Sequence, residues 1–587
     1  MKDRAPLAAL ALVLLGAVAY ANSLGGPFVL DDLLSIRDNP HLRALWPPAH
    51  WLSLAPQSSL SGRPLVTLSM ALCYALAGLD VRVLHAVNVA LHLANGVLLL
   101  ALLRTRLSAR AAFGGALLWT LHPLCTEAVD YLTQRTELMA GAFTLAALLA
   151  AARERRGVAV LCCALGMLCK ESAAAAPVAV LLWLRAYRYG SWRELFGRER
   201  GFAAALAGTW LVVAAVLLLT PRSQSVGFGL GVGALDYARS QLVAVAHYLR
   251  LAVWPGPLAI YYGPVQPIAL REALLPGLVV AGALGGALAL FLRAPRLGYP
   301  ALAFFVLLAP TSSVVPIATE VAAERRMYLP LAALVALAVC AVARVQWPPR
   351  FARIAGPLAT AAAALALGVA TFARNADYAT GVALWRSQVA ARPALAQGHV
   401  NLGIALAEAG DLRAAAAAYR GALALAPDDA RAHYDLALAL DPLGERDAAL
   451  AELERSVALE PRFEAAQLAL ARARLARGDR AGAAAALRRA LEAQPHSAAL
   501  HAELAQLLLS AGDASEALAH ARTAAGESGE RDPAVLHTRA AAEWQSGLRA
   551  EAVATEERAL ALARESAPEL APALAEQLAR YRSALGR

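Results

Sequence analysis

The sequence predicts an all-α protein in two parts, a polytopic bundle of transmembrane helices followed by an α-solenoid of helical hairpins. Hydrophobic residues make up 59% of the 587 residues, and charged residues make up only 17%. A soluble protein cannot bury that much apolar surface, so most of the chain is expected to face lipid. Long apolar runs stop near Arg374, and charged residues then recur every few positions. We therefore expect a polytopic membrane domain over residues 1–375 and a linker over 376–395.

About eleven spans are predicted in the membrane domain. A spanning helix needs roughly 20 apolar residues, and fewer where other helices bury it. The predicted spans are centred on 5–22, 83–103, 110–122, 136–152, 157–169, 173–187, 201–220, 274–292, 298–312, 328–345 and 354–373. Two further apolar stretches, 63–78 and 237–254, would break the alternation of loops if either alone were a span. We expect them to be external helices on the membrane surface.

Arginine-rich loops predict the orientation of the chain. Clusters in the ranges 104–110, 153–156 and 185–200 fall in alternate loops, on the same side as Lys2 and Arg4. The positive-inside rule assigns that side to the cytoplasm. An odd number of spans then places the N-terminus in the cytoplasm and the repeat domain outside it. The Ala- and Arg-rich composition indicates a bacterial source, so the expected location is the inner (plasma) membrane, with a periplasmic repeat domain.

Charge and cysteine content exclude other classes of protein. The net charge is +10, but much of the arginine lies in short loops between apolar spans, so it is read as a topology signal and no nucleic-acid partner is expected. None of the six cysteines forms a CxxC pair or a metal-ligand spacing with histidine. Neither a zinc site nor a disulfide framework is predicted. The first apolar run is expected to be a retained helix, because no clean cleavage site follows it.

The last third of the chain has a strict internal period. Gly410, Gly444, Gly478 and Gly512 are each 34 residues apart, and prolines from Pro393 onward repeat with the same period. A 34-residue period with glycine and proline at fixed positions is typical of tetratricopeptide (TPR) repeats. About five units are expected over 396–566, followed by a capping helix over 567–587. Such an array presents a concave surface to a peptide or protein, so a protein partner is predicted.

Ionisable residues collect in the loops that are predicted to be external. They are Asp31, Asp32, Arg63, His122, Glu127, Lys170, Glu171, Glu324, Arg325 and Arg326, with Tyr328 close by. Ionisable residues at membrane depth are costly, and so they are functional candidates by default. Each also has a structural interpretation, as a solvated turn, a helix end or a rim ion pair. The structural interpretations weaken together, because all of these positions meet on one side of the predicted topology.

The order of these features resembles the GT-C glycosyltransferases, which use lipid-phosphate-linked sugars. It is more closely similar to the transmembrane and tetratricopeptide repeat-containing (TMTC) proteins and their bacterial relatives, which resemble protein O-mannosyltransferases. The residues that carry the resemblance are Asp31-Asp32 with Asn39, Arg63-Pro64-Leu65, His85 with Asn88 and His92, His122-Pro123 with Glu127, Lys170-Glu171 with Pro177, and Ala323-Glu324-Arg325 with Tyr328-Leu329-Pro330. The resemblance implies an inverting transfer in which an acidic residue at the start of the first external loop is the general base.

The chemistry assigns a role to each candidate. Asp31 or Asp32 would accept the proton of the acceptor hydroxyl, and the sequence does not choose between them. Arg325 would stabilise the leaving phosphate, with Arg326 second, Tyr328 as a hydrogen-bond donor and Lys170 as a further cation. The supporting residues are Glu324, which would orient the arginine, His122 and Glu127, which would bind sugar, acceptor or a divalent metal ion, and Glu171 and Arg63. No residue is assigned to a metal site.

The leading hypothesis is therefore a membrane glycosyltransferase. It would move a sugar, with mannose as the first expectation, from a polyprenyl-phosphate donor to a protein Ser/Thr hydroxyl on the extracytoplasmic side. The TPR domain would capture the acceptor, and membrane lipid would surround the bundle. The alternatives are a non-catalytic membrane scaffold for protein–protein interaction and a lipid-linked sugar transporter. A transporter favours mid-membrane charges and inverted repeats, which the sequence does not show.

Overall fold

The computed structural model describes residues 5–52, 58–220, 231–313, 315–345 and 349–586. Over these residues the chain is helical, without a β-strand, so the predicted all-α class is confirmed. The chain divides into two compact units, Met1–Pro393 and Ala394–Arg587. Each unit is described below by itself.

Each predicted span coincides with one helix or with two consecutive helices. In order these are α1 (Ala5–Ala19), α4 (Val81–Leu103), α5 (Ala109–Thr120), α7 (Arg135–Ala152), α8 (Arg156–Met167), α9 (Ala176–Tyr187), α11 with α12 (Arg200–Gly208, Trp210–Leu219), α14 (Leu270–Arg293), α15 (Pro295–Leu308), α16 (Tyr328–Val342) and α17 (Pro349–Asp377). Within the described part of the chain, six helical stretches are long and apolar enough to cross a membrane by length and composition. The protein is thus a membrane protein, and eleven spans remain a prediction.

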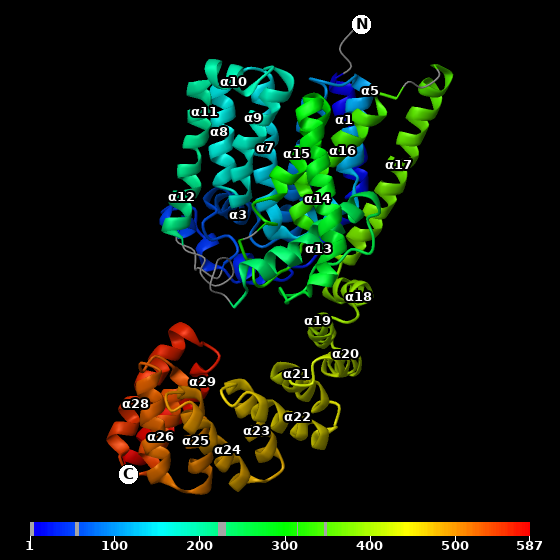
Figure 1. Cartoon of the computed structure of the whole chain (residues 1–587). Helices are drawn as coiled ribbons and strands as arrows, with labels where there is room; N and C mark the ends of the chain where they lie inside the picture. The colour runs from blue at the N-terminus through cyan, green and yellow to red at the C-terminus, as the bar shows by residue number, and fades with distance from the viewer. Residues whose placement is uncertain (1–4, 53–57, 221–230, 314, 346–348, 587) are drawn as a thin grey trace. The chain divides into compact units, whose positions relative to one another are not determined.

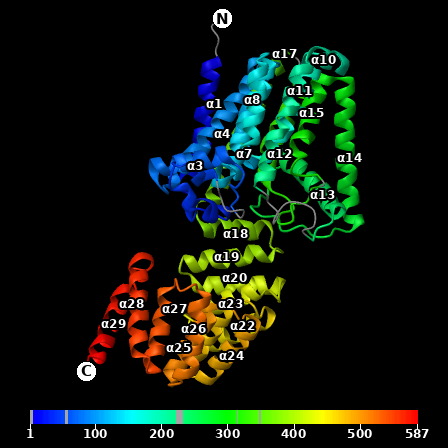
Figure 2. The same ribbon diagram turned by 90° about the vertical axis from the view of Figure 1, so that its left-hand side faces the viewer.

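The helices of the first unit run alternately between two ends of a bundle. The short α10 (Trp192–Arg198), in an arginine-rich loop, lies at one end, and α13 (Ala234–Val253) lies at the other (Figure 1 and Figure 2). The most enclosed span is the one that contains α7, with 72% of its apolar window buried. Helix α7 therefore forms the centre of the bundle, and loops from both directions of the chain gather around its N-terminal end.

Two helices occupy the stretches that were predicted to be surface helices. They are α3 (Pro64–Ala77) and α13. Each helix has one buried face and one exposed face. In α13, for example, Tyr237 and Tyr248 are buried, whereas Leu235 and Val253 are exposed. Their interior faces cover the end of the bundle at which the predicted site residues lie.

The segment 376–395, which was predicted to be a linker, contains a helix. Helix α18 (Gly381–Ala391) begins at Thr380, whose hydroxyl accepts a hydrogen bond from the Ala383 N–H at 3.0 Å. The Gln388 side chain pairs with the backbone of Tyr261, accepting from its N–H at 3.1 Å and donating to its carbonyl at 2.8 Å. These two bonds hold α18 to the first unit.

The second unit is a row of helical hairpins. Its helices are α19 (Ala396–Glu408), α20 (Leu412–Leu425), α21 (Ala430–Leu440), α22 (Arg446–Leu459), α23 (Glu464–Ala476), α24 (Arg480–Ala493), α25 (Ala498–Ala511), α26 (Ala514–Glu527), α27 (Pro533–Gln545), α28 (Arg549–Ser566) and α29 (Ala571–Leu585). Each turn glycine of the predicted period has a positive φ, such as +82° at Gly410. Only glycine adopts that backbone cheaply. The aspartates that follow Gly410 and Gly478 then cap the next helix.

Candidate functional site

Loops distant in sequence meet at the end of the bundle that carries α13. The Asp31 N–H donates to the Tyr131 hydroxyl at 3.0 Å, across 100 residues of sequence. Arg325 and Glu127 form an ion pair across 198 residues. Lys170 reaches Glu137 at 2.7 Å. The structure therefore brings together most of the charged residues that the sequence singled out.

The two adjacent aspartates have different environments. Asp32 is fully buried, and its carboxylate accepts from the N–H groups of Val29 at 3.2 Å and Thr133 at 2.8 Å. Burial raises the pKa of Asp32 to about 7, against the opposing effect of these two hydrogen bonds. Asp31 is exposed, and its carboxylate makes no hydrogen bond or ion pair with the described residues. Asp32 thus fixes the loop, and Asp31 leaves a carboxylate available.

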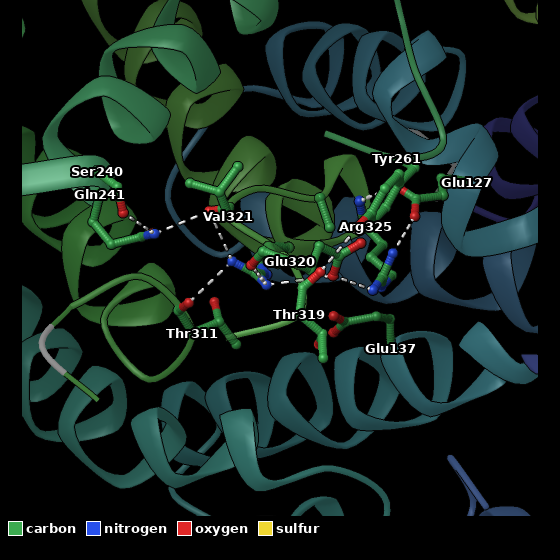
Figure 3. A network of polar contacts seen from close by, with 12 residues as sticks. Glu127, Glu137, Ser240, Gln241, Tyr261, Thr311, Thr319, Glu320, Val321 and Arg325 are labelled. Atoms are coloured by element: carbon green, nitrogen blue, oxygen red, sulfur yellow. Dashed lines mark hydrogen bonds and ion pairs between the residues drawn. The ribbon is translucent and has the colours of Figure 1, made fainter. Parts of the chain in front are cut away.

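Arg325 is held between two carboxylates (Figure 3). Its guanidinium contacts Glu127 at 2.5 Å on one side and Glu320 at 2.5 Å on the other. The Arg325 N–H also donates to Glu127 at 2.7 Å, so one buried carboxylate fixes both the backbone and the side chain. The guanidinium carbon lies 6.0 Å from the centre of the Tyr131 ring. Tyr131 therefore contacts the Asp31 backbone with its hydroxyl and Arg325 with its ring.

Arg326 meets this cluster through Glu320, whose carboxylate lies 3.4 Å from its guanidinium. It is buried, and it donates to the carbonyl of Glu320 at 3.0 Å and, at 3.4 Å, to the carbonyl of Thr311. In Figure 3 this loop is also joined to α13, where Gln241 donates to the Val321 carbonyl at 2.9 Å. Arg326 consequently ties the chain between α15 and α16 together, and its donors are shared among backbone oxygens and the Glu320 carboxylate.

Two predicted roles do not match the positions of the side chains. Glu324, predicted to orient Arg325, instead accepts from the Ala259 N–H at 2.5 Å and the Tyr262 hydroxyl at 2.8 Å. Glu127 and Glu320 orient Arg325 in its place. The Tyr328 hydroxyl, predicted to face phosphate, lies in the bundle interior, 2.9 Å from His92 and 3.0 Å from Asn95. The reason is helical phase, because Tyr328 begins α16 with its side chain toward α4.

His122 has a structural position. One ring nitrogen accepts from the Leu124 N–H at 3.2 Å, and the other lies 3.3 Å from the Ala252 carbonyl. Both nitrogens are thus engaged, and His122 ends α5 as the N-cap of the following turn. The described residues contain no group of three or more His, Cys, Asp or Glu side chains that could hold a metal ion. Glu127 is engaged with Arg325 and does not meet His122.

A small cavity of about 380 Å³ lies next to Glu137, the partner of Lys170. Polar groups in its wall include Glu137, Ser172, Thr311 and Arg326. Beside it, burial lowers the pKa of Lys170 to about 8, and the Glu137 partner opposes that shift. Arg63 lies 3.2 Å from Glu171, and both side chains are partly exposed. Lys170 and Arg63 are therefore close to the site, each with a carboxylate partner.

Sequence reasoning missed Glu320 and Tyr131, and it gave no role to Arg135, an ionisable residue in a loop predicted to be external. Glu320 shares Arg325 with Glu127, Tyr131 separates Arg325 from Asp31, and Arg135 is fully buried. Arg135 donates to Asn88 at 2.8 Å and to the Leu84 carbonyl at 2.9 Å, which fixes α7 to α4. A signal existed for Tyr131 and Arg135, because both follow Glu127 within a segment rich in polar residues. Glu320 carried no such signal.

Comparison with known proteins first identifies the repeats. A family model described as a tetratricopeptide repeat matches residues 400–467 and 468–533. The C-terminal unit is a tetratricopeptide repeat array. Among solved structures, the chain is similar to MamA (21% identity, 30% of this chain, 94% of that chain, TM-score 0.26) and to TTC0263, a thermophilic TPR protein of Thermus thermophilus (27% identity, 33% and 100%, TM-score 0.26).

Curated relatives share the repeat region. The mouse protein O-mannosyl-transferase TMTC3 is 36% identical over 141 residues, which are 23% of this chain and 15% of the relative. The Xenopus laevis protein O-mannosyl-transferase tmtc2 is 37% identical (23% and 17%), and the Caenorhabditis elegans protein O-mannosyl-transferase F38B6.6 is 32% identical (25% and 23%). The repeat region is TMTC-like. The chain covers less than a quarter of each of these relatives, and the site residues lie outside the matched repeats.

Proposed function

We propose that this protein is an inverting, GT-C-type membrane glycosyltransferase. It transfers a sugar from a polyprenyl-phosphate donor to a Ser/Thr hydroxyl of a protein, and mannose is the first sugar to test. One observation carries the proposal: Tyr131 contacts both candidates, the backbone N–H of Asp31, whose carboxylate is available, and the held guanidinium of Arg325. Base and phosphate-binding cation are the two groups that such a reaction needs. The names of the TMTC relatives, protein O-mannosyl-transferases, support the same reaction class.

Asp31 is the proposed general base. Its carboxylate accepts the proton of the acceptor hydroxyl while the hydroxyl oxygen bonds to the anomeric carbon. The bond from that carbon to the phosphate oxygen breaks, and polyprenyl phosphate leaves with the electron pair. Asp32 is assigned a positioning role, because both of its oxygens accept backbone hydrogen bonds.

Arg325 is the proposed stabiliser of the leaving phosphate. Its contact with Glu320 is the exchangeable one, since that carboxylate is 13% exposed whereas Glu127 is fully buried. A phosphate that displaces Glu320 would receive a guanidinium still oriented by Glu127. Lys170 supplies a second positive charge nearby. Because the carboxylates here bind Arg325, charge neutralisation is assigned to the arginine and not to a divalent metal ion.

The repeat unit is proposed to bind the acceptor protein. TPR arrays are peptide- or protein-binding folds, and acceptor capture concentrates a hydroxyl near the catalytic loops. The proposed location is a bacterial inner membrane. With the N-terminus in the cytoplasm, the repeats and the catalytic loops lie on the periplasmic side.

Sugar transfer in proteoliposomes tests this function. The full-length protein is reconstituted with polyprenyl-phosphate mannose and an acceptor protein, and mannose incorporation is measured. Asp31→Asn removes the base and keeps the volume, so transfer should fall about 100-fold or more. The matched control is Asp38→Asn, an exposed aspartate in the same loop that pairs with its neighbour Arg37. Equal transfer by Asp31→Asn and the unsubstituted protein would contradict the catalytic assignment.

A membrane-anchored scaffold is the second candidate function. It is favoured by one observation, that Arg325, Lys170 and Arg63 all have carboxylate partners in this structure. Under that function the repeats recruit partners and the bundle is an anchor. The same experiment distinguishes the two, because a scaffold shows no sugar transfer in any variant.

A further inference from the structure

A second and larger cavity lies within the bundle, among α4, α7, α9, α15 and α16. The space between its lining side chains, including its open mouth, is about 640 Å³, and hydrocarbon side chains dominate its wall, including Leu99, Leu145, Ala303 and Ala333. Towards the arginine-rich end it is bordered by the last turns of α4, α9 and α16. An apolar cavity of this size in a membrane protein suits a hydrocarbon chain better than a water-soluble molecule.

Arg106 lies at one end of this cavity. Its guanidinium carbon is 4.9 Å from the centre of the Tyr187 ring and 5.6 Å from that of the Trp183 ring. Stacking on aromatic faces leaves the in-plane N–H edge of a guanidinium free to bind an anion. The Arg106 guanidinium makes no hydrogen bond or ion pair with the part of the chain that the structure describes, although the Arg106 backbone N–H donates to the Leu103 carbonyl at 3.0 Å. Its donors are therefore available.

Two further arginines add to the positive charge at this end. Arg296 and Arg344 lie within electrostatic reach of the Tyr187 hydroxyl, as Arg106 does, and that hydroxyl donates to the Arg296 carbonyl at 2.8 Å. None of the three guanidinium groups pairs with a carboxylate among the described residues. Three like charges without a counter-ion repel one another, and an anion bound among them would relieve that repulsion.

We propose that this cavity binds an anionic membrane phospholipid. One acyl chain occupies the apolar cavity, and the phosphate contacts Arg106 with Arg296 and Arg344 beside it. Basic pockets between transmembrane helices are the sites at which anionic headgroups bind. The site is distinct from the sugar-transfer site, and the proposal does not depend on that activity.

Lipid binding to the full-length protein tests the proposal. The protein is purified in detergent, stripped of lipid and titrated with dioleoylphosphatidylglycerol or dioleoylphosphatidylcholine, and bound lipid is counted by native mass spectrometry. Phosphatidylglycerol should bind roughly tenfold more tightly than phosphatidylcholine, because only its headgroup carries a net negative charge. Arg106→Ala should abolish most of that preference, because it removes a charge-assisted hydrogen bond. Arg110→Ala is the matched control, an exposed arginine at the same end that does not border the cavity.

A cavity-filling substitution separates the contribution of the acyl chain to binding from that of the headgroup. Ala333→Phe keeps every charge but fills the cavity, so phosphatidylglycerol binding should fall while the lipid-free melting temperature shows that the protein folds. Ala336→Phe, also in the wall, replaces it if Ala333→Phe does not fold. Inorganic phosphate should not compete, because it has no chain.

Three results would overturn the proposal. In the first, Arg106→Ala and the cavity-filling variant bind phosphatidylglycerol like the unsubstituted protein. In the second, inorganic phosphate competes as well as the lipid, which would make the site one for a free anion. In the third, polyprenyl phosphate displaces the lipid with an affinity that Arg106→Ala leaves unchanged, which would assign the cavity to the donor chain.

Discussion

At the scale of single residues, the site depends on which donors and acceptors are already engaged. Asp31 and Asp32 are neighbours in sequence, yet only Asp32 accepts hydrogen bonds with both carboxylate oxygens. Arg325 and Arg326 also differ, because the Arg325 guanidinium donates to two carboxylates, whereas Arg326 gives N–H groups to backbone carbonyls as well as to the Glu320 carboxylate. A pair of identical residues thus divides into one that builds the loop and one that is available for chemistry.

Replacing each arginine by lysine should separate these two roles. Arg325→Lys keeps a positive charge but cannot bridge Glu127 and Glu320, so mannose transfer should fall roughly 10- to 100-fold with little change in melting temperature. Arg326→Lys loses bonds inside its loop, so its melting temperature should fall more than its turnover. Transfer rates and thermal unfolding of both variants check the prediction, and the reverse pattern would exchange the two roles.

The sequence predicted the site loops better than the direction of each side chain. The charges at Asp31, Glu127, Lys170 and Arg325 identify loops that do meet. Glu324 and Tyr328 were assigned with Arg325 because they are adjacent in sequence, but successive residues at a helix start point in different directions. Only the packing of α16 against α4 determines that Tyr328 faces His92. No pattern in one sequence contains that information.

A partly buried aspartate in the repeats carries a predicted pH dependence. Burial in α21 raises the pKa of Asp435 to about 6, above its unfolded value. The native unit therefore binds more protons between about pH 4 and pH 6, and its stability falls as pH rises through that interval. Asp435→Asn should slow amide hydrogen exchange in α21 at about pH 8 and leave it unchanged at about pH 4. A stabilisation of equal size at both pH values would contradict the assigned pKa shift.

At the scale of helices, the glycines within the repeat helices are of two kinds, those at close helix contacts and those without a neighbour. A Cβ on Gly403 would lie 2.5 Å from the Tyr419 ring, so α19 and α20 approach each other only because the side chain is absent. Gly526 in α26 has nothing within 4 Å of its Cβ position. The 34-residue period predicted the hairpins, because turn glycines recur at each one. The period could not show which helical glycines are contacts.

Alanine substitution at the two positions should have opposite effects. Gly403→Ala should destabilise the α19–α20 hairpin by about 1–3 kcal/mol through overpacking. Gly526→Ala should stabilise its helix by up to about 1 kcal/mol, since alanine has the higher helix propensity. Hydrogen exchange of each hairpin in the full-length protein measures both. Destabilisation of similar size by both substitutions would show that helix geometry, and not the Tyr419 contact, governs the effect.

The position of helix α18 at the end of the first unit depends on Gln388. Gln388 makes both of its side-chain hydrogen bonds to the Tyr261 backbone, and no sequence pattern predicts a helix docked there. Gln388→Leu should leave the Tyr261 N–H and carbonyl without partners and release α18. Protease cleavage near Arg392 should then become several-fold faster. The matched control is Val389→Leu, which places the same leucine at the neighbouring position and keeps both hydrogen bonds. Equal cleavage in both variants would remove the docking role from Gln388.

At the scale of the whole molecule, orientation is the property that the arginine pattern predicts most directly. Asp441→Cys, at an exposed position in the repeats, should react with an impermeant thiol reagent added outside intact cells. Arg198→Cys, exposed in the arginine-rich α10, should react only after permeabilisation. Labelling in the opposite order would place the repeats in the cytoplasm and remove the proposed role of the TPR array in periplasmic acceptor capture.

The two cavities of the bundle share part of one wall. Thr144, Leu307 and Leu329 border both the small polar cavity beside Lys170 and the large apolar cavity that ends at Arg106. An occupant of either cavity therefore contacts the same three side chains. If a lipid in the large cavity changes the affinity of the small cavity for a ligand, that ligand must change the affinity for the lipid by the same factor. The composition of the surrounding membrane would then act as an effector of the proposed sugar transfer, with these three residues as the coupling element.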